Sequence, residues 1–137
     1  MKLTRRSFAC LKFYRFKMST TINLQIAKRW MQAFNEHNLD MLLSLYHEEA
    51  VHFSPKLLIR LPETKGLIKG KVAMHSWWKD AFDRLPTISN LPTNFIANDS
   101  MVFMEYLRKV QGEEELKVGE VLEIKDGLIV ASRVYHG

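Results

Sequence analysis

Cysteine is almost absent from this sequence of 137 residues, and its one occurrence, Cys10, lies near the N-terminus. Residues 18–137 therefore cannot form a disulfide bond or use a thiolate, which fits a reducing compartment. Long hydrophobic runs are absent too, because none reaches the roughly 18 residues that a membrane-spanning helix needs. The sequence thus predicts a soluble, cytoplasmic protein that has no membrane partner.

Acidic residues are missing from the first 17 positions, which hold six of the 20 lysine and arginine residues. From Met18 onward, the remaining 14 basic residues meet all 15 acidic residues, so the formal net charge of +5 becomes −1. The basic character of the chain belongs to this leader. It gives no reason to expect nucleic acid as a partner of the domain.

The leader contains Thr4-Arg5-Arg6-Ser7-Phe8, which is close to a twin-arginine export motif. Lysine and arginine residues interrupt the apolar segment that should follow such a motif, so we do not expect export. We predict that residues 1–17 are disordered or not part of the native domain, with translation starting at Met18, and that residues 18–137 form one domain. The alternative is a basic arm that touches a membrane or nucleic acid through Phe8, Phe13, Tyr14 and Phe16.

Motifs for metals, nucleotides and covalent catalysis are also lacking. His47 and His52 are five residues apart, which on a helix places them about 140° from each other, too far to share a metal ion. The sequence contains no glycine-rich phosphate-binding loop, and none of its serines lies in a nucleophile-elbow motif. The sequence therefore predicts neither a cofactor nor a metal site.

The spacing of apolar residues changes along the chain from that of helices to that of strands. It predicts a helix from Ile22 to near Glu36, a second helix capped by Asn38, and a third over residues 72–85. Short strands are expected at residues 50–53, 93–97, 100–110 and 115–125, and the segment between Pro55 and Gly70 reads as irregular. Helices followed by a strand meander predict an α+β domain, with three N-terminal helices on one side of a curved antiparallel sheet.

The last two strands are predicted around Asp126-Gly127, a strong signal for a two-residue hairpin loop. Pairing outward from this loop places Glu120 opposite Arg133 on the buried face, and Val118 opposite Tyr135. The other face carries apolar residues beside only a few charges, which predicts a homodimer through the sheet: Val121, Leu128, Val130 and Val134.

Three charged residues are the candidate catalytic groups. A two-residue or four-residue turn near Gln111-Gly112, which we favour, places Glu105 on the same face as Glu120 and Arg133, whereas an odd-length turn would reverse its direction. A buried carboxylate with a raised pKa can act as a general base, and Arg133 can hold an oxyanion or a substrate carboxylate. The alternative is a structural ion pair with a spare glutamate at the rim.

Aromatic side chains are numerous for so small a domain, and they could line a pocket for a planar, apolar small molecule. The alternative is that they form ordinary core. We expect the adjacent Trp77 and Trp78 not to face one cavity, because neighbouring residues on a helix point about 100° apart. The candidate pocket residues are Trp30, Tyr46, Phe53, Trp77, Phe103 and Tyr135.

Several short motifs, together with the order of elements, resemble the SnoaL-like branch of the nuclear transport factor 2-like superfamily over residues 22–137. They are Trp30, Phe34, Asn35, His37-Asn38-Leu39-Asp40, Tyr46, Ala50-Val51-His52-Phe53, Gly66, Gly70, Asp126-Gly127-Leu128-Ile129, Arg133 and Tyr135. The resemblance implies a cone-shaped domain that encloses a hydrophobic cavity, often in a homodimer. Members include polyketide cyclases, ketosteroid isomerases and limonene-epoxide hydrolases.

This resemblance sets the functional expectation. It implies a domain that binds a small apolar molecule, with cofactor-independent isomerase, cyclase or hydrolase activity as the candidate activity. General acid/base chemistry on an apolar carbonyl or cyclic compound is the reaction type implied. The alternative is a non-enzymatic module that binds a ligand or another protein.

Overall fold

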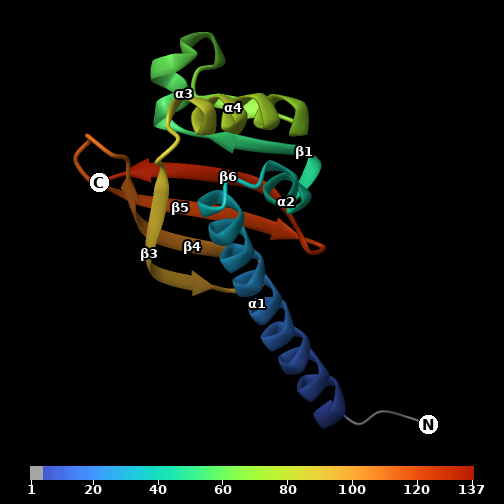
Figure 1. The fold of residues 1–137 in the computed structure, drawn as a ribbon. Coiled ribbons are helices and arrows are strands. Elements are labelled where there is room, and N and C mark those ends of the chain that lie inside the picture. The colour runs from blue at the N-terminus through green and yellow to red at the C-terminus, as the bar shows by residue number, and fades with distance from the viewer. Residues whose placement is uncertain (1–4) are drawn as a thin grey trace.

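The first helix is longer than the sequence predicts. The computed structural model describes residues 5–137, and in it α1 (Arg5–Asn35) is one continuous helix whose N-terminal half projects beyond the sheet (Figure 1). The expected start at Ile22 is wrong. Neither glycine nor proline interrupts residues 5–35, and the hydroxyl side chains of Ser19, Thr20 and Thr21, which could have capped a helix at that point, are not enough to break one. Residues 5–17 are helical, residues 1–4 lie outside the described residues, and whether this leader belongs to the native domain stays a prediction.

Three further α-helices follow. Asn38 caps α2 (Leu39–Ser44) as predicted, since its side chain accepts a hydrogen bond from the amide of Met41. The segment expected to be irregular instead contains α3 (Pro55–Arg60), which begins at a Ser54 cap, and a 3-10 turn, η1 (Pro62–Thr64). The expected third helix is confirmed as α4 (Lys71–Arg84).

Six strands form one sheet in the order β2-β1-β6-β5-β4-β3. Their bounds are β1 (Tyr46–Phe53), β2 (Leu67–Lys69), β3 (Ser89–Ala97), β4 (Met101–Lys109), β5 (Leu116–Lys125) and β6 (Leu128–His136). Neighbouring strands are antiparallel except for β1 and β6, which run parallel, so the sheet is not wholly antiparallel as the sequence predicts. The α+β class and the helices-on-sheet arrangement are confirmed.

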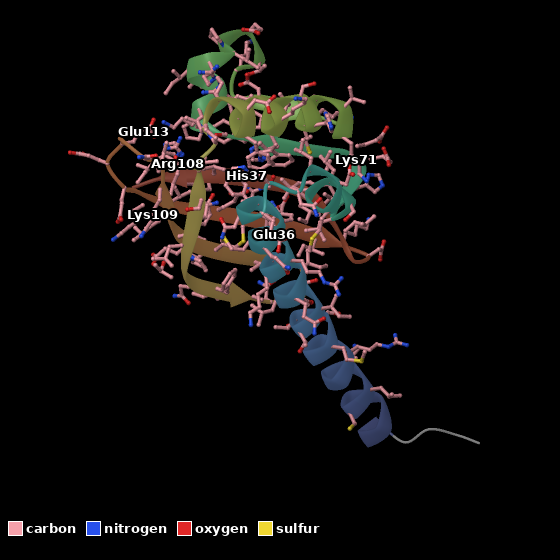
Figure 2. The ribbon with its side chains drawn as sticks, in the orientation of Figure 1. Glu36, His37, Lys71, Arg108, Lys109 and Glu113 are labelled. Atoms are coloured by element: carbon pink, nitrogen blue, oxygen red, sulfur yellow. The ribbon has the colours of Figure 1, made fainter. Side chains whose placement is uncertain are left out.

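The helices cover one face of the curved sheet. The C-terminal half of α1 lies across β3 and β4, whereas α4 lies near β1 (Figure 1) and α3 contacts β6. Arg108, Lys109 and Glu113 lie near the end of the sheet where β4 leads into β5 (Figure 2). The core between helices and sheet is aromatic and aliphatic, with Trp30, Leu42, Met74, Met104 and Leu122 among its fully buried members. Among the described residues, no helix is both long enough and apolar enough to cross a membrane.

The hairpin at Asp126-Gly127 forms as predicted, but its register holds for only two pairs. Both loop residues have positive φ, as a type I′ turn requires, and Lys125 and Ile124 lie opposite Leu128 and Ile129. The next pair is Glu123 with Ala131, so one residue of β6 is extra and forms a β-bulge. Every later pair is shifted by one residue, which reverses the faces of the rest of β6.

The connection between β4 and β5 contains an odd number of residues. Arg108 lies opposite Leu116, and residues 109–115 between them place Met104 opposite Glu120 and Glu105 opposite Gly119. Even-numbered residues of β4 therefore face the helices with Glu120, and odd-numbered residues face outward. The favoured register, with Glu105 on the face of Glu120, is wrong. The length of the turn decides which face each residue of β4 takes, and the Glu113-Glu114-Glu115 segment contains no residue that fixes that length.

Candidate functional site

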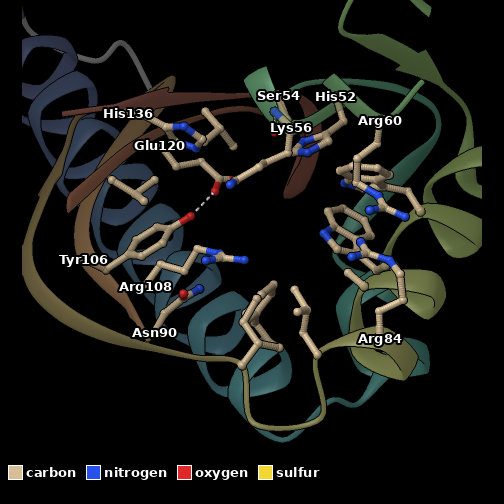
Figure 3. Close-up of a pocket in the computed structure, with 18 of the residues that line it drawn as sticks. His52, Ser54, Lys56, Arg60, Arg84, Asn90, Tyr106, Arg108, Glu120 and His136 are labelled. Atoms are coloured by element: carbon tan, nitrogen blue, oxygen red, sulfur yellow. Dashed lines mark hydrogen bonds between the residues drawn. The ribbon is translucent and has the colours of Figure 1, made fainter. Parts of the chain in front are cut away.

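A cavity of about 300 Å³ lies between the inner face of the sheet and the helices. Its walls come from α1, α3, α4, β1 and the strands from β3 to β6, and Figure 3 shows its polar residues distributed around an open centre. The apolar part of the wall consists mainly of Trp30, Phe34, Trp77, Trp78, Ile88 and Val118. The volume lies at the small end of the range for small-molecule sites.

Glu120 is the buried acid of this cavity. It lies on β5 and is 1% exposed, and its Oε1 accepts a hydrogen bond of 2.7 Å from the Tyr106 hydroxyl (Figure 3). Its Oε2 is buried and has no hydrogen-bond partner in the described part of the chain. Burial raises the pKa of Glu120 from 4.5 to about 8, although the Tyr106 hydrogen bond lowers it. Near neutral pH, this carboxyl is therefore able both to donate and to accept a proton.

Asn90 is a second polar side chain left without a partner. Its backbone is fixed by Asn35 on α1, whose side chain donates to the Asn90 carbonyl at 2.8 Å and accepts from the Asn90 amide at 2.7 Å. The Asn90 side chain lines the cavity and is 4% exposed, yet neither Oδ1 nor Nδ2 is hydrogen bonded within the described chain. Because buried amides are normally paired, this position is suited to a ligand.

His52 is held by a chain of hydrogen bonds behind the cavity wall. The indole of Trp30 can only donate, and it donates to the Tyr46 hydroxyl at 3.0 Å. Tyr46 donates to Ser132 Oγ at 3.2 Å, which leaves the serine proton for Nδ1 of His52, 2.6 Å away. We therefore assign the His52 proton to Nε2. Burial lowers the pKa of His52 to about 4, so its ring is neutral near pH 7.

Ser132 and His52 do not form a nucleophilic pair. Ser132 is fully buried and lies behind the lining residues, so a substrate in the cavity cannot reach its hydroxyl. The shifted β6 register is what directs Ser132 inward and completes the chain from Trp30. The bulge therefore positions His52, a residue of β1 that lies opposite Ser132.

Four cations surround the cavity mouth (Figure 3). Lys56 and Arg60 come from α3, Arg84 from the end of α4, and Arg108 from β4. The mouth also contains Glu113, whose Oε2 is 2.8 Å from Nη1 of Arg108.

Two of the three predicted catalytic residues lie outside the cavity. Arg133 is on the outer face and pairs with Glu123 at 3.1 Å, so the predicted pairing with Glu120 is wrong. Glu105 also faces outward, where Thr93 donates to its Oε1 at 2.7 Å. The physical reasons are the β6 bulge and the odd β4–β5 connection. Only Glu120 lies where the sequence placed it.

The predicted aromatic pocket is partly realised. Trp30 and Trp77 line the cavity, and Trp78 does too, so the expectation that adjacent tryptophans cannot share it is wrong. A cavity that is wider than one helix face admits both rings.

The other four aromatic predictions are corrected. Tyr46 lies behind the wall in the hydrogen-bonded chain, and Phe53 packs against Gly66. Phe103 and Tyr135 face outward for the same register reasons as Glu105 and Arg133, and both are exposed.

Sequence reasoning missed several lining residues, namely His52, Lys56, Asn90, Tyr106, Arg108 and His136. Tyr106 and Arg108 occupy even-numbered positions of β4, whereas Glu105 occupies an odd-numbered one. An odd-length turn would therefore have predicted that Tyr106 and Arg108 face the cavity. The sequence gives no sign of Lys56, because it predicts an irregular segment where α3 forms. No group of three potential metal ligands occurs among the described residues.

The fold and this site define a helix-covered, cone-like domain with an acid in an apolar cavity. The SnoaL-like domain family matches residues 27–132, and the chain belongs to this family. A comparison with curated proteins finds no match.

Solved structures share the fold. A SnoaL-like protein of unknown function from Burkholderia thailandensis is 23% identical, with a TM-score of 0.77 over 85% of this chain and 95% of the other. A candidate ketosteroid isomerase from Kribbella flavida is 18% identical, with a TM-score of 0.71 over 87% and 80%. A candidate polyketide cyclase from Sinorhizobium meliloti is 16% identical, with a TM-score of 0.69 over 81% and 94%. At these identities the likeness shows the fold alone.

Proposed function

We propose that the domain binds a small, largely apolar carbonyl or cyclic compound and catalyses its cofactor-independent isomerisation, cyclisation or hydration. The observation that carries the proposal is the unpartnered Oε2 of Glu120 at the wall of an apolar cavity. A general acid/base works best when its pKa lies near the working pH, as burial arranges for Glu120. The names of the structural neighbours agree with this reaction class.

The residues support a two-step proton transfer. Ionised Glu120 removes a proton through Oε2 from a carbon next to the substrate carbonyl, and the electron pair moves to the carbonyl oxygen. The Nε2–H of His52, on the cavity wall, is the donor that we assign to that oxygen. Protonated Glu120 then returns the proton to another carbon, which completes an isomerisation without a net change in atoms or charge. Tyr106 acts as a positioning residue because its hydrogen bond fixes Oε1.

Deuterium incorporation tests the proposal without knowledge of the natural substrate. A panel of cyclic ketones and 1,3-dicarbonyl compounds is incubated with the protein in D2O, and exchange at the acidic carbon is followed by proton NMR. We expect exchange that accelerates as pH rises through about 8 and that falls at least 100-fold in Glu120→Gln. Glu114→Gln, in the exposed β4–β5 turn, removes a carboxyl far from the reaction and serves as the control.

The rival function is a non-enzymatic ligand-binding or protein-interaction module. A ketone that binds in the cavity without catalysed exchange would favour that rival and overturn the catalytic proposal. Native mass spectrometry of the protein purified from its own cells would identify a retained compound and supply the substrate for direct assay.

A further inference from the structure

The cavity mouth is cationic, although the domain as a whole is not. Residues 18–137 carry a formal charge of −1, yet the lining residues include Lys56, Arg60, Arg84 and Arg108 against Glu113 and the neutralised Glu120. The lining of this opening is therefore more positive than the domain as a whole. A cavity mouth lined mainly by positive charges, in a wall of low dielectric constant, attracts a negatively charged group of a ligand.

These cations are only partly neutralised by the protein itself. Arg60 and Arg84 share one carboxylate: Oδ2 of Asp80 lies 3.6 Å from Nη2 of Arg60 and 2.8 Å from Nε of Arg84. Arg108 has Glu113, whereas within the described residues no ion pair joins Lys56. More positive than negative groups thus remain at the mouth.

Glu120 lies deeper in the cavity than Arg108 does. Counted from the mouth inward, the inward-facing residues of β4 are Arg108, then Tyr106, and then Met104, which lies opposite Glu120. Glu120 is therefore two inward-facing rows deeper than Arg108, or about 13 Å along the strand backbone. Val118, opposite Tyr106, is an apolar lining residue of the row between them, and the unpartnered Asn90 lies opposite Arg108 on β3.

We propose that the natural ligand is an amphipathic carboxylic acid, with an apolar ring system in the cavity and its carboxylate at the mouth among Lys56, Arg84 and Arg108. This inference rests on the proposed function, since it assumes that the ligand occupies this cavity, and it adds the charge of the ligand. The Asn90 amide donates to the same end of the molecule. The carboxylate-binding role predicted for Arg133 is thereby assigned to residues of α3, α4 and β4.

Matched acid and amide pairs test the charge of the ligand. Binding of 2-naphthoate and 2-naphthamide, and of the equivalent pair built on cyclohexane, is measured with the full chain by isothermal titration calorimetry at pH 7. We expect at least one acid to bind tenfold or more tightly than its amide. The preference should shrink in 0.5 M NaCl, because salt screens charges at a solvent-accessible mouth.

Charge-changing variants of opposite sign locate the effect. Lys56→Met should weaken acid binding fivefold or more, and Glu113→Gln should strengthen it because Arg108 loses its competing carboxylate. Neither change should alter the affinity of the amide. Lys109→Met and Glu115→Gln make the same charge changes in a pair that lies outside the cavity, 3.4 Å apart, and should leave both affinities unchanged.

Equal binding of acid and amide, or no binding of any probe, would overturn the inference. So would equal effects of Lys56→Met and Lys109→Met, since the preference would then follow net charge and not the mouth. The proposed catalysis is read separately by deuterium exchange. Acid preference without exchange would refute the proton transfer alone, and exchange without acid preference would refute the charge inference alone.

Discussion

Glu120 should make the protein less stable as pH rises. The folded state holds the carboxyl proton more tightly than the unfolded chain, because the pKa is about 8 in the fold and 4.5 when the group is solvated. The free energy of unfolding therefore falls between pH 4.5 and 8. At about 1.4 kcal/mol for each pH unit, the full loss is about 5 kcal/mol above pH 8.

Glu120→Gln isolates this effect, because glutamine has the same shape and can still accept the Tyr106 hydrogen bond but cannot ionise. At pH 5 we expect its free energy of unfolding to lie within about 1 kcal/mol of wild type. At pH 9 it should exceed wild type by several kcal/mol, approaching about 5. The measurement is urea unfolding followed by tryptophan fluorescence at each pH.

His52 makes the difference between the two proteins more informative than the wild-type curve. Its pKa falls from 6.5 to about 4 on folding, so stability is lost as pH drops through that interval. Between pH 4.5 and 6.5, the slopes due to His52 and Glu120 oppose each other. Subtracting the Glu120→Gln curve removes His52 from the comparison.

Glu114→Gln removes an exposed carboxyl from the β4–β5 turn and should stay within about 0.5 kcal/mol of wild type throughout. If Glu120→Gln differs from wild type by the same amount at pH 5 and pH 9, the carboxyl is not desolvated. The acid/base role derived from its burial would then lose its basis.

Three other results are expected. Arg133→Met should cost no more than about 1 kcal/mol in urea unfolding, because its ion pair with Glu123 is solvent-accessible; a loss of 3 kcal/mol or more would restore the buried pairing that the bulge removes. Gly66→Ala should cost at least about 1 kcal/mol more than Gly112→Ala, since both have positive φ but only at Gly66 would a Cβ lie 2.7 Å from the Phe53 ring; equal losses would contradict this packing. We also propose that the chain forms a homodimer through the outer face of the sheet, where Ile96, Phe103, Val121 and Tyr135 are adjacent and at least partly exposed; a monomeric mass in light scattering at micromolar concentration would exclude it. Val134, which the sequence placed on that face, is buried instead.

The sequence by itself determines the class of the domain and most of its elements. Helical spacing before residue 86, and alternation after it, identify α4 and the strand meander because amphipathic periodicity is local. The Asn38 cap and the Asp126-Gly127 loop follow from the conformations those residues favour. Glu120 is identified as a buried acid because it lies in an alternating run of apolar residues.

Only the tertiary structure decides what surrounds Glu120. One extra residue in β6 turns Arg133 and Tyr135 outward and Ser132 inward, and the seven residues 109–115 turn Tyr106 inward in place of Glu105. Adding or removing one residue in a strand or turn changes the local free energy little. The packing of both faces of the whole sheet therefore decides the register. The cationic mouth depends on the same kind of information, since Lys56, Arg84 and Arg108 are far apart in the chain and meet only when α3, α4 and β4 converge.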